Sequence, residues 1–222
     1  QVVEQACSDK CNSFTVPSLS KLEPIENNIF GTKFRYDGVE YETAMGGGHQ
    51  IKNAVTAIET ARLLGAAQKN IVQGIRRAKV AARQEVIAEK PLVLLDGGHN
   101  EDGGRVLGES LKRASLGGKT VAVLSMMADK SIDDYLSFVA PLCREIVTVT
   151  VAENPRAQSA QALKTAAERF CPNVCACEDA CKAIHLANGK LRDGECLLVC
   201  GSLYLAGEVR NELKKFFAAD TL

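Results

Sequence analysis

The segment that decides the fold runs from Leu94 to Gly104 and reads LLDGGHNEDGG. It continues the apolar run LVLL, which predicts a buried strand, and it leads into a stretch that we expect to be helical. A carboxylate, two glycines, a histidine and an asparagine therefore follow one another where a strand ends. In an open α/β sheet, ligands bind in the crevice beyond the carboxyl ends of the strands. Because a structural turn rarely needs Asp96, His99 and Asn100 side by side, the segment predicts a ligand site in an α/β domain.

From Pro91 onward, short apolar runs rich in β-branched residues alternate with amphipathic stretches. The predicted strands cover 92–95, 120–125, 146–151, 173–177 and 195–200. The predicted helices cover 101–114, 132–142, 159–170, 178–187 and 203–217. Successive βα units of this kind predict a Rossmann-like, mostly parallel sheet that is flanked by helices on both faces and joined by right-handed crossovers.

The residues before this region have a different pattern. FRYDGVEY, at 34–41, alternates apolar and polar residues around Asp37-Gly38, which is a strong signal for a two-residue β-hairpin turn. Apolar residues at helical spacing predict helices over 50–64 and near 68–78. The segment does not resemble a whole domain, because it holds one hairpin and a few helices only.

We expect the chain to divide near residue 88, into units 1–88 and 89–222. The chain starts with Gln1 rather than methionine, and the following VVEQA has the pattern of the middle of a helix. We therefore expect it to be a fragment of a longer protein, with further sequence upstream.

Composition excludes several classes of protein. The chain has 222 residues, of which 46% are apolar and 24% charged, so it can bury a sizeable core. Its 27 basic and 27 acidic residues give a formal net charge of zero, which argues against a nucleic-acid-binding protein. No apolar run approaches the roughly 20 residues of a membrane helix, and no signal-peptide pattern opens the chain. We expect a cytoplasmic monomer that binds neither nucleic acid nor membrane.

The chain contains nine cysteines, an odd number that is awkward for a fully disulfide-bonded secreted domain. The densest group is Cys171, Cys175, Cys177 and Cys181, and four thiolates can form a closed zinc site. The spacing C-x3-C-x-C-x3-C differs from the usual paired C-x2-C arrangement. The alternative is a strand in which Cys175 and Cys177 share one face, followed by a helix that carries Cys181. We therefore predict reduced thiols and no metal.

Polar residues follow several of the predicted strands. They are Asp96, His99 and Asn100 after the first strand, Asp129 and Lys130 after the second, Glu153, Asn154 and Arg156 after the third, and Gly201 and Ser202 after the fifth. The carboxyl ends of parallel strands share one edge, so these groups are predicted to face one crevice. Loops are polar in any case, so the pattern alone leaves a structural explanation open. Asp96 could accept hydrogen bonds from a ribose diol, or it could be satisfied by local amides.

Two further segments could bind phosphate. AARQEVI contains Arg83, whose guanidinium matches phosphate oxygens, and Glu85, with which an interdomain ion pair is the alternative. MGGGHQIKNA places His49, Gln50 and Asn53 at the start of a helix after three glycines, where amides attract anions. No G-x-x-x-x-G-K-[ST] motif occurs in the chain, so the sequence contains no P-loop.

Together and in this order, these motifs resemble the folylpolyglutamate synthase and dihydrofolate synthase family, within the Mur ligase superfamily. The family pattern is G-x-HQ-x-x-NA, GR-x-E, LLDGAHNP, a DK turn and GSLY. The matching segments are GGHQIKNA (47–54), ARQE (82–85), LLDGGHNE (94–101), ADKS (128–131) and GSLY (201–204). The similarity spans residues from about 30 to 208. Departures at Val80–Ala82, Gly98 and Glu101 bear on substrate preference more than on fold.

The resemblance implies an ATP-dependent amide ligase. Such enzymes phosphorylate a folate carboxylate to an acyl phosphate, which the amino group of glutamate then attacks. The nucleotide contacts carried over from the family are those of Asn53 with adenine, Arg83 with the ATP phosphates and Asp96 with the ribose. His99, Lys130 and Ser202 match positions that orient the second substrate.

The resemblance also implies that part of the machinery lies outside this chain. The P-loop, the Mg²⁺ ligands and a carbamylated lysine belong to the family's N-terminal ATPase domain. The chain is expected to hold the tail of that domain and the whole Mur-type C-terminal domain, and so no complete catalytic set. We expect the fragment to be inactive alone. The alternatives are another Mur-type amide ligase and a non-catalytic nucleotide-binding module.

Overall fold

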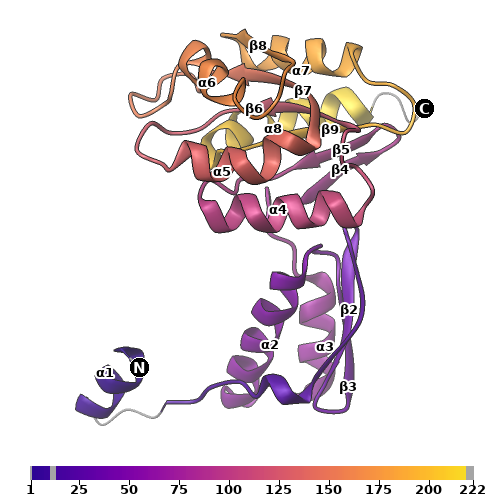
Figure 1. Cartoon of the computed structure of the whole chain (residues 1–222). Helices are drawn as coiled ribbons and strands as arrows, with labels where there is room; N and C mark the ends of the chain where they lie inside the picture. The colour runs from indigo at the N-terminus through magenta and orange to yellow at the C-terminus, as the bar shows by residue number, and fades with distance from the viewer. Residues whose placement is uncertain (1, 11–13, 219–222) are drawn as a thin grey trace.

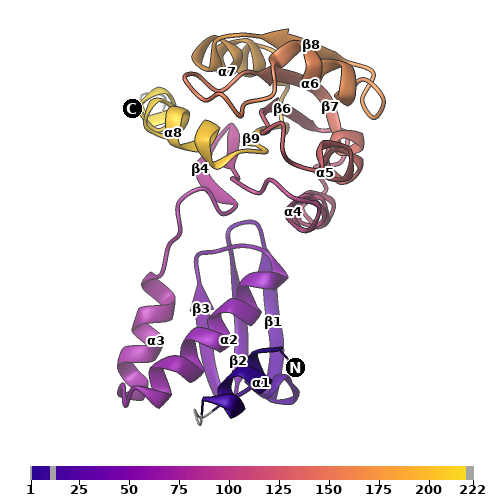
Figure 2. The same ribbon diagram turned by 90° about the vertical axis from the view of Figure 1, so that its left-hand side faces the viewer.

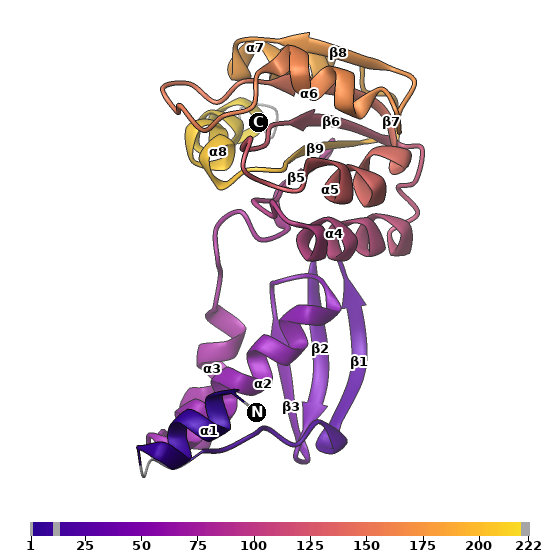
Figure 3. The ribbon, with the colours of Figure 1, turned by 60° about the vertical axis from the view of Figure 1, so that its left-hand side comes forward.

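The computed structural model describes residues 2–10 and 14–218, and most of these residues form two lobes (Figure 1). The N lobe comprises residues 22–77, the C lobe comprises residues 85–218, and a linker of residues 78–84 joins them. Helix α1 (Val2–Asp9) lies toward the end of the N lobe that is remote from the C lobe (Figures 1 and 3).

The N lobe is a small antiparallel sheet with two helices packed on one face. Its elements are β1 (Leu22–Asn28), β2 (Gly31–Tyr36), β3 (Val39–Thr43), α2 (Gly48–Leu63) and α3 (Gln68–Arg77). Asp37 and Gly38 have φ values of 52° and 78°, the signs that a tight hairpin turn requires. The predicted hairpin and both predicted helices are confirmed, whereas β1 was not predicted.

The C lobe is built on a six-stranded sheet with the order β4-β5-β9-β6-β7-β8. The strands are β4 (Glu85–Glu89), β5 (Leu92–Leu95), β6 (Thr120–Leu124), β7 (Cys143–Val149), β8 (Val174–Cys177) and β9 (Cys196–Cys200). All neighbours pair in parallel except β4, which lies antiparallel to β5 at the edge. The mostly parallel α/β fold is confirmed. The predicted division at residue 88 falls within β4, because EVIAE lacks the βα pattern of the other strands.

Helices cover both faces of this sheet (Figure 2). One face packs against α4 (Glu101–Arg113), α5 (Ile132–Val139) and α6 (Ala160–Ala167), and the other packs against α7 (Ala180–Gly189) and α8 (Leu203–Ala218). The last strand, β9, lies between β5 and β6, so the strand order reverses there. Such a reversal opens a crevice beyond the carboxyl ends of the strands.

The two lobes touch at the tip of the β1–β2 turn, which meets the C lobe beside α4 (Figure 3). Ile29, in this turn, is 6% exposed and packs in the same core cluster as Leu94 and Leu107 of the C lobe. A second region between the lobes is a groove of about 1320 Å³ along β4. The linker crosses this groove, so residues 78–84 are shared between the two lobes.

The cysteine cluster does not converge. Cys171 is buried on the α6 side of the sheet, whereas Cys175 and Cys177 pack on the opposite side and Cys181 is exposed on α7. The shared face of Cys175 and Cys177 is confirmed. Within residues 2–10 and 14–218, no three His, Cys, Asp or Glu side chains are arranged to hold a metal ion. No described helix is both long and apolar enough to cross a membrane.

Candidate functional site

Asp96 lies at the carboxyl end of β5 and is 6% exposed. Its Oδ2 accepts a hydrogen bond from the Gln84 amide at 2.9 Å, and its Oδ1 accepts one from the Gly98 amide at 2.8 Å. Burial raises the pKa of this carboxyl, while the two amides and the Arg83 charge oppose that rise. The structure therefore contains the local amide bonds of the alternative interpretation, and one lone pair on each oxygen remains for a ligand.

Gly97 and Gly98 have no side chains, so the turn after Asp96 packs closely against its neighbours. The Gly97 amide donates to the Ala82 carbonyl at 2.7 Å, and a Cβ on Gly97 would lie 2.2 Å from Leu203 Cδ2. A Cβ on Gly98 would lie 2.7 Å from Asp96 Oδ1. A side chain on Gly97 would therefore displace the Leu203 side chain of α8, and one on Gly98 would crowd the Asp96 carboxylate.

His99 and Asn100, which follow Gly98, make different contacts. Asn100 Oδ1 accepts the Gly103 amide at 2.8 Å, so Asn100 rather than His99 is the N-cap of α4. His99 Nδ1 lies 3.0 Å from the Gly97 carbonyl oxygen. A carbonyl can only accept, so Nδ1 carries the proton and Nε2 of this half-buried ring is left as an acceptor in the neutral form.

Arg83 lies in the linker, at the junction of the two lobes. Across the described residues its half-buried side chain forms neither a hydrogen bond nor an ion pair. Burial and the positive charge of Arg83 lower the pKa of His49 in the N lobe. Arg83 also contributes to the electrostatics of Asp96 in the C lobe. The guanidinium is therefore close to both lobes without being neutralised by either.

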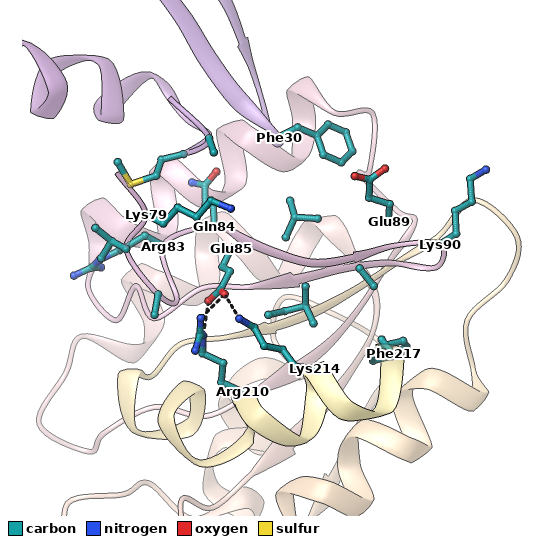
Figure 4. A pocket seen from close by; sticks show the side chains of 17 residues that line it. Phe30, Lys79, Arg83, Gln84, Glu85, Glu89, Lys90, Arg210, Lys214 and Phe217 are labelled. Carbon is teal, nitrogen blue, oxygen red and sulfur yellow. Dashed lines mark hydrogen bonds and ion pairs between the residues drawn. The ribbon is translucent and has the colours of Figure 1, made fainter. Parts of the chain in front are cut away.

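The alternative that Arg83 pairs with Glu85 is wrong. Glu85 binds Arg210 of α8 through two hydrogen bonds, from Nε at 2.8 Å and from Nη2 at 2.7 Å, and its Oε1 lies 3.2 Å from Lys214 Nζ. Figure 4 shows this cluster on one wall of the groove, with the Arg83 side chain extending away from it. Burial alone would raise the pKa of Glu85, but bonds from Arg210, the Ala82 amide and Lys214 lower it to about 2.

The HQ-x-x-NA segment opens α2 on the N-lobe side of the junction. Gln50 is buried, with Nε2 3.0 Å from His49 Nε2, and Asn53 Nδ2 donates to Gln50 Oε1 at 3.1 Å. Because the amide nitrogen donates, His49 Nε2 accepts and Nδ1 carries the proton. Nδ1 is buried without a partner, as are Gln84 Oε1 and Asn27 Oδ1. Asn53 itself is exposed.

The remaining predicted residues lie on neighbouring strand ends. Ser202 is 2% exposed, and its Oγ accepts the amides of Tyr204 and Leu205 at 3.1 and 3.3 Å, so it begins α8. The Ser202 hydroxyl proton is not used by these bonds. Lys130 Nζ lies 3.5 Å from Asp129 Oδ2, an oxygen that also accepts from Arg156 at 2.6 Å.

The structure thus brings together most, but not all, of the predicted residues. Asp96, Ser202 and Lys130 follow β5, β9 and β6, which are adjacent strands about 4.8 Å apart. Arg83 and His99 lie at the same end of β5, whereas Asn53 lies across the junction on α2. Sequence reasoning missed Gln84, Arg210 and Lys214. Arg210 and Lys214 form an i,i+4 basic pair on α8, but nothing in the sequence indicates that this pair contacts Glu85.

The model of the Mur ligase glutamate ligase domain matches residues 82–203, which is more than half of the chain. The chain belongs to the Mur ligase family. The match begins in the linker, covers β4 through β9 and ends at the GSLY segment. It therefore includes Arg83, Asp96, His99, Lys130 and Ser202.

Within the Mur ligases, the chain is similar to curated folate enzymes. It is 29% identical over 219 residues to the dihydrofolate synthase/folylpolyglutamate synthase of Bacillus subtilis, covering 95% of this chain and 49% of that protein. The enzyme of the same name from Mycobacterium tuberculosis is 32% identical over 186 residues, covering 74% and 38%. The chain thus spans about half or less of these relatives, and the predicted resemblance to the C-terminal portion of folylpolyglutamate synthases is confirmed.

Solved structures agree with this fold. A folylpolyglutamate synthase from Mycobacterium tuberculosis, complexed with ADP and AMPPCP, has a TM-score of 0.83 at 23% identity and covers 96% of this chain and 52% of its own. The folylpolyglutamate synthase of Thermotoga maritima has a TM-score of 0.77 at 27% identity and covers 97% and 51%. Both likenesses span the N lobe as well as the C lobe, so the two-lobe arrangement is part of the shared fold.

Proposed function

We propose that this chain is part of an ATP-dependent ligase that joins glutamate to a folate carboxylate. The observation that carries the proposal is the position of Arg83. Its guanidinium has no partner in the described structure and lies where the Asp96–Asn100 turn of one lobe meets the His49–Asn53 segment of the other. A free cation among hydrogen-bonding groups at a lobe junction suits a nucleotide phosphate.

The proposed nucleotide contacts are those of Arg83, Asp96 and Asn53. Arg83 would bind phosphate oxygens through its planar fork. Asp96 would accept from a ribose hydroxyl with the lone pairs that its two amide bonds leave unused. Asn53 would contact adenine from the exposed surface of α2, where Gln50 already orients its amide. The buried and unpartnered His49 Nδ1 and Gln84 Oε1 show that this junction has unused polar capacity.

The second substrate would lie further along the strand ends. His99 Nε2, Lys130 and Ser202 offer an acceptor, a cation and a hydroxyl donor there. Lys130 and Arg156 share the Asp129 carboxylate, so this region already stabilises one carboxylate between two cations. The glutamate carboxylates would need the same kind of partner. At the opposite end of the sheet the Arg144 guanidinium is bound by Glu195 and the Lys190 carbonyl, so we place neither substrate there.

ATP would supply the phosphoryl group that activates the folate carboxylate as an acyl phosphate. Arg83 fits such a group, because it is a half-buried and unpaired guanidinium. Mg²⁺ would be held mainly outside this chain, since the described residues contain no cluster of three potential ligands. The role of these residues is to bind and orient, with the phosphate cradle in a preceding ATPase domain. We also propose a cytoplasmic, monomeric enzyme.

The test is ligation by the full-length protein that contains this chain. With ATP, Mg²⁺, a reduced folate and labelled glutamate, we expect a folate product that carries extra glutamate, and release of ADP and phosphate. The isolated 222-residue chain should show no turnover above a blank without protein. Activity toward another acid acceptor, with none toward folates, would replace the folate proposal by another Mur-type ligase. Nucleotide binding without any ligation would indicate a binding module.

A further inference from the structure

We propose that Glu85 and Arg210 are positioning residues, which hold the loop of residues 82–85 so that Arg83 projects into the lobe junction. The loop is named the Arg83 loop below. The inference deepens the proposed function, since phosphate binding by Arg83 rests on it. The structure adds the interaction that fixes the arginine, in which Glu85 binds Arg210 of α8, 125 residues further along the chain.

The backbone of the Arg83 loop has an unfavourable conformation that other residues must stabilise. Ala82 and Gln84, on either side of Arg83, have φ values of 54° and 47°. Residues with a side chain rarely adopt this left-handed region, and each such residue persists only where its surroundings impose it. Two of them around one arginine therefore require external restraints.

Three backbone hydrogen bonds supply these restraints. The Ala82 amide donates to Glu85 Oε2 at 3.0 Å, and the Ala82 carbonyl accepts the Gly97 amide at 2.7 Å. The Gln84 amide donates to Asp96 Oδ2 at 2.9 Å. Polar groups of the backbone on both sides of Arg83 are thus bound, while the Arg83 side chain is bound to nothing in the described structure. The loop is fixed and its functional group is left available.

Glu85 is the restraint that depends on a distant element. Its carboxylate accepts the Ala82 amide and, at the same time, two hydrogen bonds from Arg210 of α8 (Figure 4). A bidentate arginine fixes the plane of a carboxylate, which a single lysine cannot do. Lys214 adds charge at 3.2 Å. Since Glu85 is neutralised by α8, it does not compete with a phosphate for Arg83.

The same arrangement occurs at the other end of the sheet and serves as an internal control. Glu195 Oε2 accepts the amide of Arg192, three residues earlier, and both Glu195 oxygens accept hydrogen bonds from Arg144 at 2.7 Å. The arginine whose amide this pair binds, Arg192, is exposed and lies at the opposite end of the sheet from the proposed site. Substitution of Arg144 therefore reports what the loss of such a pair does to the fold alone.

The test compares Arg210→Ala, Arg210→Lys and Arg144→Ala in the full-length protein. We expect Arg210→Ala to raise the KM for ATP about tenfold, because a small displacement of a binding group is costly. Arg210→Lys should recover part of this loss, and Arg144→Ala should leave the KM at the wild-type value. Hydrogen exchange at the Ala82 and Gln84 amides should accelerate in Arg210→Ala and not in Arg144→Ala.

A double variant separates positioning from general damage. If Arg210 acts through Arg83, then Arg83→Ala combined with Arg210→Ala should have the same KM for ATP as Arg83→Ala alone. Multiplied effects in the double variant, or faster amide exchange with an unchanged KM in Arg210→Ala, would overturn the proposal. Absence of any ATP-dependent ligation by the wild-type protein would instead overturn the proposed function, and the exchange measurement would still test whether Arg210 fixes the loop.

Discussion

Each end of the C-lobe sheet has a glycine with a positive φ and a glutamate–arginine pair, but the surroundings of these groups differ. At the amino end of β9, Gly194 has open space around it, and Glu195 and Arg144 are joined by two hydrogen bonds. At the carboxyl end, Gly201 is crowded by backbone, and the Glu85–Arg210 pair leaves the neighbouring Arg83 without a partner in the described chain.

Buried polar atoms without partners at the carboxyl end include Gln84 Oε1 and Ser125 Oγ. A buried polar group without a partner costs free energy, so such atoms persist where a ligand or water can satisfy them. Tight packing and buried polar atoms without partners therefore occur together at one end of the sheet. We therefore treat the carboxyl end as the functional end and the amino end as its structural reference.

The largest effect is expected from Asp96→Ala. This change removes the acceptor of two amides, those of Gln84 and Gly98, in a buried place. At about 1–3 kcal/mol for each amide left without a partner, the loss of unfolding free energy should be about 2–6 kcal/mol. Asp193→Ala, at the exposed amino end of β9, should change it by no more than about 0.5 kcal/mol. Equal denaturation midpoints for the two variants would contradict the comparison.

A somewhat smaller effect is expected from Gly201→Ala. Gly201 has a φ of 89°, and a Cβ there would lie 2.4 Å from the Ser125 carbonyl oxygen. Gly194, with a φ of 77°, has no atom within 4 Å of the added carbon. Both variants carry left-handed strain of about 1–2 kcal/mol, and only Gly201→Ala adds an overpacking cost of about 1–3 kcal/mol. Urea unfolding of both variants checks this, and a less stable Gly194→Ala would reverse the assignment.

The stabilisation by Glu85 is expected to depend on pH. Its pKa is about 2 in the folded chain, below the ordinary value of 4.5, so ionised Glu85 stabilises the fold above pH 4.5. This contribution, at most about 3 kcal/mol, should be lost as the pH falls from 4.5 to 2. The stability difference between wild type and Glu85→Gln should therefore be constant above about pH 5 and should shrink below it. A constant difference down to pH 2 would show that the carboxylate charge is not what stabilises the loop.

Much of the fold could be predicted because apolar strands and amphipathic helices leave periodic signals. β5 through β9 were found in this way, as was the hairpin at Asp37-Gly38. β1 and β4 were missed for physical reasons. LEPIENN contains a proline and five exposed or polar positions, and the register of β1 shifts between Pro24 and Glu26. EVIAE forms β4, which pairs antiparallel with β5, and no helix separates the two strands in the sequence. The alternation of strands and helices that indicated the other strands is therefore absent here.

The candidate site was only partly predictable. Asp96 and Arg83 were found because each lies in a recognisable motif. The partner of Glu85 was not found, since Arg210 lies 125 residues away and a long-range ion pair leaves no local pattern. The two amide bonds of Asp96 also depend on the path of the linker, which brings Gln84 to the end of β5.

The central claim is that the carboxyl end of the sheet, and not the amino end, binds the nucleotide. Its most direct test is the KM for ATP of Arg83→Ala and Arg144→Ala in the full-length protein. Loss of a charge-assisted hydrogen bond costs about 1.5–3 kcal/mol, so Arg83→Ala should raise the KM roughly 10- to 150-fold. Its melting temperature should stay at the wild-type value, because Arg83 has no described partner to lose. Arg144→Ala should lower the melting temperature and leave the KM unchanged. A wild-type KM for Arg83→Ala, or a raised KM for Arg144→Ala, would contradict the account.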